Sequence, residues 1–194
     1  MRPYLKDPAA IYAESFAAVA REARLDRFPE DLRGLVARVV HACGMPEVAD
    51  RLAYSPGAGA AGRAALAEGA PVLCDCAMVA AGITRLAAGH EVVVTLNHPG
   101  VPELARRLGT TRSAAAVELW EGKIAGAVVA IGNAPTALFH LLERLDAGWP
   151  RPALILGFPV GFVGAAESKA ELGADPRGAA FVTLKGRRGG SAMA

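Results

Sequence analysis

The stretch Ala127-Val-Val-Ala-Ile131-Gly-Asn-Ala-Pro135-Thr-Ala-Leu-Phe139 decides the fold. Its first five residues are all apolar and bounded by glycine, which is typical of a buried strand. The glycine and proline that follow indicate a turn, and the apolar residues after Pro135 recur at helical spacing. A buried strand, a short turn and a helix together form the repeating unit of a parallel α/β sheet.

The same unit recurs along the chain after Glu68. Apolar runs that predict strands lie at residues 71–74, 92–96, 127–131, 153–156 and 180–184. Stretches that predict helices lie at residues 77–83, 102–108, 113–121, 136–145 and 165–172. This succession predicts a three-layer α/β/α fold with a mostly parallel central sheet, whose ligand site lies beyond the carboxyl ends of the strands.

Two N-terminal helices are expected to precede the sheet. Asp7 and Pro8 have the residue types of an N-cap and a first helical position, and apolar residues follow at helical spacing. A second helix over residues 29–43 has one apolar face and ends at Gly44. On this second helix, His41 lies outside the main apolar stripe.

Length and composition narrow the class of protein. The chain has 194 residues, of which 53% are hydrophobic and 21% charged, with 22 glycines and 13 prolines. These values exclude a disordered or collagen-like protein, and the length predicts a single domain over residues 1–194.

The net charge of +2 comes from dispersed residues, so nucleic acid is not an expected partner. Asp75 and Arg85 interrupt the longest apolar run, residues 72–88, so no membrane span is expected.

The three cysteines bear on the compartment and on metal binding. Cys43, Cys74 and Cys76 are odd in number and lie in apolar stretches, and no signal peptide is visible, which together predict a reduced, cytoplasmic protein. Cys74-Asp75-Cys76 has the wrong spacing for a zinc knuckle, and no second Cys/His pair follows at a usual distance. We therefore expect buried thiols and no metal site.

One short motif points to a different function. Gly57-Ala-Gly59-Ala-Ala-Gly62 matches the glycine pattern of dinucleotide-binding proteins, and Asp75 lies downstream of it. That pattern binds a nicotinamide cofactor only where a strand leads into the first glycine and a helix receives the pyrophosphate. Residues 48–56 instead predict a helix and a turn, which favours a chance match. A nicotinamide-dependent oxidoreductase is therefore kept as an alternative that requires a strand ending at Gly57.

His41 is the candidate for proton transfer. It occupies the last turn of its helix, where unpaired carbonyls and the negative end of the helix dipole favour the imidazolium form. Arg38 lies one turn earlier and opposes this effect. A histidine that only caps the helix would also fit, and the spacing does not decide between the two.

Several cations lie near the predicted turns. Each can be explained as a scattered surface charge, but together they could surround a ligand that carries several carboxylates. They are Arg85, Arg112, Lys185, Arg187 and Arg188.

Longer strings of residues resemble those of one family. They are Ile11-Tyr-Ala-Glu-Ser15-Phe, Arg38-Val-Val-His41-Ala-Cys-Gly44, Leu73-Cys-Asp-Cys-Ala-Met-Val-Ala-Ala-Gly-Ile-Thr84-Arg85, Thr111-Arg112-Ser, Gly132-Asn-Ala-Pro-Thr-Ala-Leu-Phe139, Pro159-Val-Gly-Phe-Val-Gly-Ala-Ala-Glu-Ser-Lys169 and Gly186-Arg-Arg-Gly-Gly-Ser191. They extend over nearly the whole chain, which in these strings resembles the precorrin-8X methylmutases, a family also known in a cobalt-precorrin form.

The resemblance implies an isomerase of cobalamin biosynthesis. Such an enzyme moves a methyl group from ring carbon 11 to ring carbon 12 of precorrin-8X to give hydrogenobyrinate, without a cofactor, and the family forms α/β homodimers. It further implies that His41 donates and accepts a proton and that Ser15, Arg38, Thr84 and Arg112 bind the substrate. A non-catalytic corrinoid-binding protein is the other alternative, and it would not need His41 to face the ligand.

Overall fold

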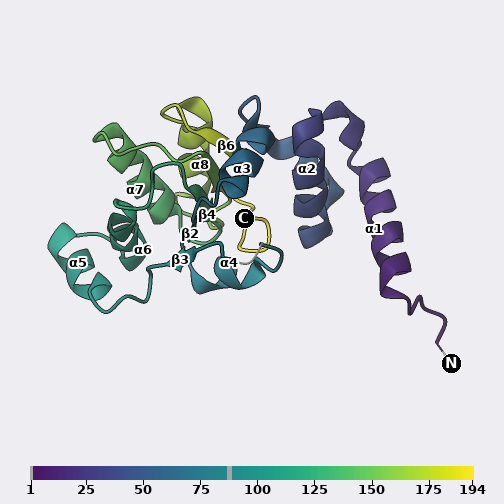
Figure 1. The fold of residues 1–194 in the computed structure, drawn as a ribbon, viewed down its shortest axis with the longest axis horizontal. Coiled ribbons are helices and arrows are strands. Elements are labelled where there is room, and N and C mark those ends of the chain that lie inside the picture. Colours follow the sequence, from purple (N-terminus) through teal and green to yellow (C-terminus); the bar gives the residue numbers. More distant parts are fainter. Residues whose placement is uncertain (1, 87–88) are drawn as a thin grey trace.

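A six-stranded sheet forms the centre of the molecule (Figure 1), in a computed structural model that describes residues 2–86 and 89–194. The strand order is β1-β6-β5-β4-β2-β3. Strands β2 to β6 are parallel, and β1 pairs antiparallel with β6 at one edge, so the prediction of a mostly parallel sheet is confirmed. The strands are β1 (Leu52–Tyr54), β2 (Val72–Cys74), β3 (Val92–Val94), β4 (Val128–Ile131), β5 (Leu154–Gly157) and β6 (Ala180–Leu184).

Helices cover both faces of this sheet. The α-helices are α1 (Pro8–Glu22), α2 (Glu30–Cys43), α3 (Ala58–Ala67), α4 (Ala77–Gly82), α5 (Val101–Leu108), α6 (Arg112–Val117), α7 (Pro135–Asp146) and α8 (Ala165–Ala174). Short 3-10 helices lie between other elements, η1 (Leu25–Arg27), η2 (Pro46–Arg51) and η3 (Glu118–Trp120). Helices α2, α3 and α4 share one apolar core with the sheet, while α6, α7 and α8 share another. The three-layer prediction is confirmed.

Side chains that point alternately to the two faces of each strand produce these two cores. Val72 and Val128 belong to the core under α2 and α3, whereas their chain neighbours Leu73 and Val129 belong to the core under α7. All four side chains are buried, because successive residues of a strand point to opposite faces and both faces are covered. The apolar content of the sequence is thus used on both sides of the sheet.

The first N-terminal helix begins, and the second ends, at the residues that the sequence predicts. The Asp7 carboxylate accepts hydrogen bonds from the amides of Ala9 and Ala10, both at 3.2 Å, and so caps α1. Gly44, at φ 66°, ends α2 in the left-handed conformation that glycine adopts readily. Helix α1 packs against α2 and projects away from the sheet together with the N-terminus (Figure 1).

The structure corrects the prediction over residues 48–54. A helix followed by a turn was expected there, but η2 ends at Arg51 and β1 follows it. This strand has only three residues and pairs Leu52 with Leu184 at the edge of the sheet, so it is too short to give a periodic signal. The helix expected over residues 113–121 is divided into α6 and η3.

No helix within residues 2–86 and 89–194 has the length and apolarity needed to cross a membrane. The last two residues of the apolar run at residues 72–88 lie outside the described residues.

Candidate active site

His41 lies in the last turn of α2 and faces α1. Its Nδ1 is 2.9 Å from the Ser15 hydroxyl oxygen, and its ring stacks on that of Phe16 with centroids 4.8 Å apart. The Tyr12 ring lies 5.6 Å away. Residues 12, 15 and 16 share one face of α1, because positions three and four apart in a helix are neighbours. The imidazole is thus held by one hydrogen bond and two aromatic rings.

This arrangement brings together three residues that the resemblance assigns to the site. Ser15 is bonded to His41, and the Arg38 guanidinium carbon lies 5.8 Å from the centre of the Phe16 ring. Tyr12 and Phe16 were not predicted as site residues. Their spacing relative to Ser15 on α1 is the signal that would have identified them.

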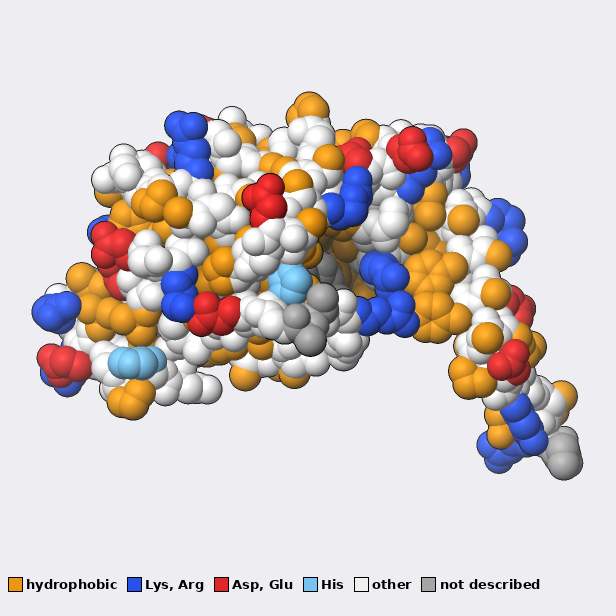
Figure 2. Space-filling view, viewed as in Figure 1, with side chains coloured by type: hydrophobic (Ala, Val, Ile, Leu, Met, Phe, Trp, Pro, Cys, Tyr) orange, Lys and Arg blue, Asp and Glu red, His pale blue; other side chains and the backbone are white. Residues whose placement is uncertain are grey.

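A cavity of about 680 Å³ lies beside this group, between α2, α3 and α4. Arg38 and His41 line it, and so do Phe158 after β5 and the C-terminal residues 191–194. Its size falls in the range of small-molecule sites, and most of its lining residues are apolar. Figure 2 shows the surface hollowed between the N-terminal helices and the rest of the molecule, with Lys and Arg side chains beside the hollow.

The segment after α4 approaches α1. The guanidinium of Arg85 donates a hydrogen bond of 3.4 Å to the Tyr12 hydroxyl, and its carbon lies 5.5 Å from the centre of that ring. Thr84 is exposed and adjoins Arg85 in the chain. The structure therefore places the Thr84 segment next to α1, whose Ser15 is bonded to His41.

Arg112 lies elsewhere in the molecule. It begins α6, and its guanidinium is 3.4 Å from both the Leu96 carbonyl oxygen and Asn97 Oδ1, just beyond β3. Helices α6 and α2 lie on opposite sides of the sheet in Figure 1. Within one chain the structure thus joins Ser15, Arg38 and His41 but leaves Arg112 apart from them.

Comparison with known proteins identifies the family. A family model described as precorrin-8X methylmutase matches residues 10–194. The chain belongs to the precorrin-8X methylmutase family. As a methylmutase, it is an isomerase of cobalamin biosynthesis, and this assignment favours catalysis over the alternative of a non-catalytic corrinoid-binding protein.

Similar methylmutases come from several bacteria. A precorrin-8X methylmutase from Pseudomonas aeruginosa is 62% identical, over 100% of this chain and 94% of its own. One from a Sinorhizobium species is 55% identical, over 98% of this chain and 91% of its own. A solved structure of precorrin-8X methylmutase from Thermus thermophilus is 39% identical, covers 95% of this chain and 91% of its own, and has a TM-score of 0.81.

In this methylmutase, the glycine motif serves helix packing. Strand β1 does precede it but ends three residues before Gly57 and runs antiparallel to β6, so α3 begins at the edge where the parallel strands start. A dinucleotide would bind at the opposite edge of such a sheet, beyond the carboxyl ends of the strands. A Cβ at Gly59 would lie 2.0 Å from the Asp31 carbonyl oxygen, and one at Gly62 would lie 2.6 Å from Leu154. This geometry argues against the nicotinamide alternative.

Asp75 also has a structural role. Its carboxylate accepts hydrogen bonds from the backbone amides of Gly132, Asn133 and Ala134 at 3.0, 2.9 and 2.8 Å. The side chain is buried and fixes the turn between β4 and α7. Its acceptor capacity is thus used by the backbone rather than left for a ribose.

Cys74 and Cys76 are buried, as expected, whereas Cys43 is half-buried, and the three cysteines form no disulfide. All three are free, and burial raises the pKa of the Cys74 thiol to about 12, so it stays protonated. Cys76 Sγ lies 3.6 Å from the Ser191 hydroxyl. Across the described part of the chain, no group of three or more His, Cys, Asp or Glu side chains is arranged to hold a metal ion.

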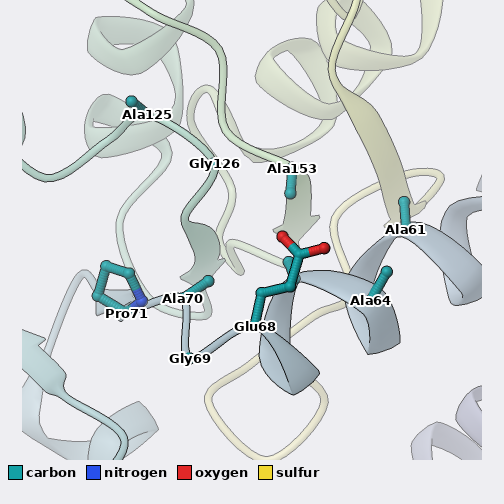
Figure 3. A pocket seen from close by; sticks show the side chains of 10 residues that line it. Ala61, Ala64, Glu68, Gly69, Ala70, Pro71, Ala125, Gly126 and Ala153 are labelled. Carbon is teal, nitrogen blue, oxygen red and sulfur yellow. The ribbon is translucent and has the colours of Figure 1, made fainter.

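A second cavity, of about 400 Å³, lies where the parallel strands begin (Figure 3). Pro71 precedes β2, Gly126 precedes β4 and Ala153 precedes β5, while α3 supplies small alanine side chains. Glu68 contributes the one charged side chain of the lining. This cavity lies at the opposite end of the strands from Asp75 and from the carboxyl ends of the strands, where ligands of such sheets bind, so we do not assign the substrate to it.

Proposed function

We propose that this chain moves the methyl group of precorrin-8X from ring carbon 11 to ring carbon 12, and that His41 donates and accepts the proton. The observation that carries the proposal is the hydrogen bond of 2.9 Å between Ser15 and His41 Nδ1 beside a cavity of about 680 Å³. A histidine that only capped its helix would not need a hydroxyl and two aromatic rings to orient it.

The chemistry requires a proton but no net change in oxidation state. The methyl group leaves one ring carbon and bonds to its neighbour, while the remaining bonds of the conjugated system shift, so no external electron donor or acceptor is needed. Protonation of a pyrrole-type nitrogen makes the conjugated system poorer in electrons and lowers the barrier to migration. A positioned acid typically contributes about 10²- to 10⁴-fold to the rate.

The two nitrogens of His41 have different roles in this proposal. In the imidazolium form, Nδ1–H donates to the Ser15 oxygen, and Nε2–H is available to the substrate. Once Nε2 has given up its proton, the ring is neutral and still bonded to Ser15. The free Nε2 lone pair then takes a proton back after the migration, so the enzyme returns to its starting state.

The cations beside the site would hold the carboxylates of the macrocycle. Arg38 lines the cavity and Arg85 lies at Tyr12, so both are placed to meet a large anion. Thr84 adjoins Arg85 and would add a hydroxyl. Arg112 would reach the same substrate only from another direction, because it lies beyond β3.

We favour the metal-free macrocycle as the substrate. The relatives that are 62% and 55% identical are named precorrin-8X methylmutase, whereas a relative from Priestia megaterium that is 35% identical is named cobalt-precorrin-8 methylmutase. Parallel assays with metal-free and cobalt-containing substrate would test this choice. A preference for the cobalt form would overturn it.

The central test is His41→Ala. We expect turnover, followed by the absorbance change on conversion of precorrin-8X to hydrogenobyrinate, to fall by about 10²- to 10⁴-fold while the coloured product still binds. Lys123→Met is the matched control, because Lys123 is a half-exposed lysine paired with Glu91 beyond the site. Full activity of His41→Ala would refute the proton-transfer role, and binding without turnover by the unmodified protein would favour the corrinoid-binding alternative.

We further propose that the enzyme is a cytoplasmic homodimer. Its three free thiols suit a reducing compartment. Large apolar side chains are exposed on α1 and on the segment before it, and such patches commonly mark an interface. They are Tyr4, Leu5, Ile11 and Tyr12.

A further inference from the structure

The turn formed by residues 186–191, which we call the arginine turn, follows β6 at the edge where the parallel strands end. It carries Arg187 and Arg188 and leads into residues 191–194, which line the cavity beside His41. The backbone passes close to the loop after β5, because a Cβ at Gly189 would lie 2.3 Å from the Phe158 carbonyl oxygen. The position of residues 191–194 in the cavity wall therefore depends on the conformation of the arginine turn.

Lys169 reaches the arginine turn from α8. It is 1% exposed, and its ammonium group donates a hydrogen bond to the backbone carbonyl of Arg188. No carboxylate among residues 2–86 and 89–194 forms an ion pair with it, so its charge is buried without a counterion. An apolar side chain would fill the same space without the desolvation cost. The lysine is thus explained by the carbonyl that it binds.

Other contacts tie the turn to the helix of His41. The Arg188 guanidinium donates a hydrogen bond of 2.8 Å to Glu47 and lies 3.7 Å from the sulfur of Met45, both just after the end of α2. Gly190 N donates to the Phe158 carbonyl at 2.8 Å. The arginine turn therefore bridges α8, the loop after β5 and the segment that follows His41.

The side chain of Arg187 takes no part in these hydrogen bonds. It is exposed, and its guanidinium carbon lies 5.5 Å from the centre of the Phe162 ring. Within the described part of the chain it has no carboxylate partner, whereas Arg188 is paired with Glu47. A guanidinium free of an internal carboxylate at the ligand edge suits a carboxylate of the substrate.

We propose that Lys169 is a positioning residue, whose ammonium holds the Arg188 carbonyl so that Arg187 is presented to a substrate carboxylate and residues 191–194 keep the shape of the cavity. This inference rests on the proposed function, because it takes the polycarboxylate macrocycle as the ligand. Lys169 itself does not touch the reacting atoms.

Two variants and a control test the positioning role. Lys169→Met removes the donor but keeps an unbranched apolar side chain, and Lys169→Arg restores a cationic donor. Lys123→Met removes an exposed lysine elsewhere and serves as the control. Each protein is first checked by thermal melting, so that all measurements are made well below its midpoint.

The first readout is limited trypsin digestion followed by mass spectrometry. The Arg188 carbonyl belongs to the peptide bond that trypsin would cut, so we expect Lys169→Met to be cleaved after Arg188 at least about tenfold faster than the unmodified protein. Lys169→Arg should be cleaved more slowly than Lys169→Met, and Lys123→Met at the unmodified rate. Equal cleavage of Lys169→Met and the unmodified protein would overturn the anchoring of the turn.

The second readout is steady-state kinetics with precorrin-8X. We expect Lys169→Met to raise KM at least about tenfold while kcat changes less than about threefold, because Arg187 contributes to binding rather than to the chemical step. A fall in kcat with unchanged KM would overturn the positioning role. Inactivity of the unmodified protein would instead refute the proposed function, and the trypsin result would still decide whether Lys169 holds the turn.

Discussion

At the scale of single residues, the Ser15 hydroxyl fixes the orientation of the His41 ring. Removing it in Ser15→Ala should lower kcat about tenfold to a hundredfold, because a hydrogen bond to a charged group contributes about 1.5–3 kcal/mol. Ser15→Thr keeps the hydroxyl and serves as the control. Steady-state kinetics with precorrin-8X would measure the effect, and an unchanged kcat in Ser15→Ala would show that the ring needs no such partner.

We expect Lys169 to make the stability of the protein depend on pH. Burial lowers its pKa from the ordinary value of 10.5 to about 8, whereas the unfolded chain regains the ordinary value. Between these two values the unfolded chain binds more protons than the folded one, so the stability contributed at Lys169 rises with pH across this window. Well below pH 8 both states are protonated, and the contribution is at its lowest.

The expected size of this effect can be measured by comparison with Lys169→Met. From about pH 7.5 to pH 10.5, the free energy of unfolding of the unmodified protein should rise relative to the variant by up to roughly 3 kcal/mol. Urea unfolding of both proteins at several pH values gives this difference. The contributions of groups that titrate in both proteins cancel when the two free energies of unfolding are subtracted. A difference that does not change with pH would contradict the lowered pKa.

At the scale of elements, Gly59 sets the approach of α3 to α2. A Cβ at this position would lie 2.0 Å from the Asp31 carbonyl oxygen, which belongs to the backbone of α2 and cannot move alone. Gly59→Ala should therefore displace α2, lower the free energy of unfolding by about 1–3 kcal/mol and reduce activity, because α2 carries His41. Gly173→Ala is the matched control in α8, where a Cβ has nothing within 4 Å.

Both glycine variants can be compared by urea unfolding and by turnover of precorrin-8X. Gly173→Ala should be neutral or slightly stabilising, because alanine has the higher helix propensity. If Gly59→Ala kept both stability and activity, the close approach of α2 and α3 would not be needed to place His41.

The elements were predictable where periodicity and caps were strong. Runs such as residues 127–131 indicated buried strands, and Asp7 and Gly44 marked helix ends that the structure confirms. Strand β1 was missed, because three residues give no period and its partner β6 lies far along the chain. Contacts between distant segments, such as Lys169 with the Arg188 carbonyl, carry no local signal either. The His41 position followed from the helix wheel, but its pairing with Ser15 required the packing of α1 on α2.

At the scale of the whole molecule, two features point beyond a single copy of the chain. Helix α1 projects from the body, and Ile11 on it is 46% exposed although isoleucine is usually buried. Arg112, which the family resemblance assigns to the substrate, lies away from His41 within one chain. A homodimer would cover the exposed apolar side chains of α1 and could bring the Arg112 of the second copy toward the site.

We therefore expect sedimentation to show a dimer that depends on the apolar side of α1. Ile11→Glu places a charge in this patch and should shift the protein toward the monomer, because burying an unpaired carboxylate at an interface is costly. Ala13→Glu adds the same charge on a different side of the same helix, 200° away at 100° per residue, and should leave the dimer intact. Activity should fall together with the dimer if both chains contribute to the site. A monomeric unmodified protein with full activity would contradict this, and so would an Ile11→Glu variant that remains dimeric.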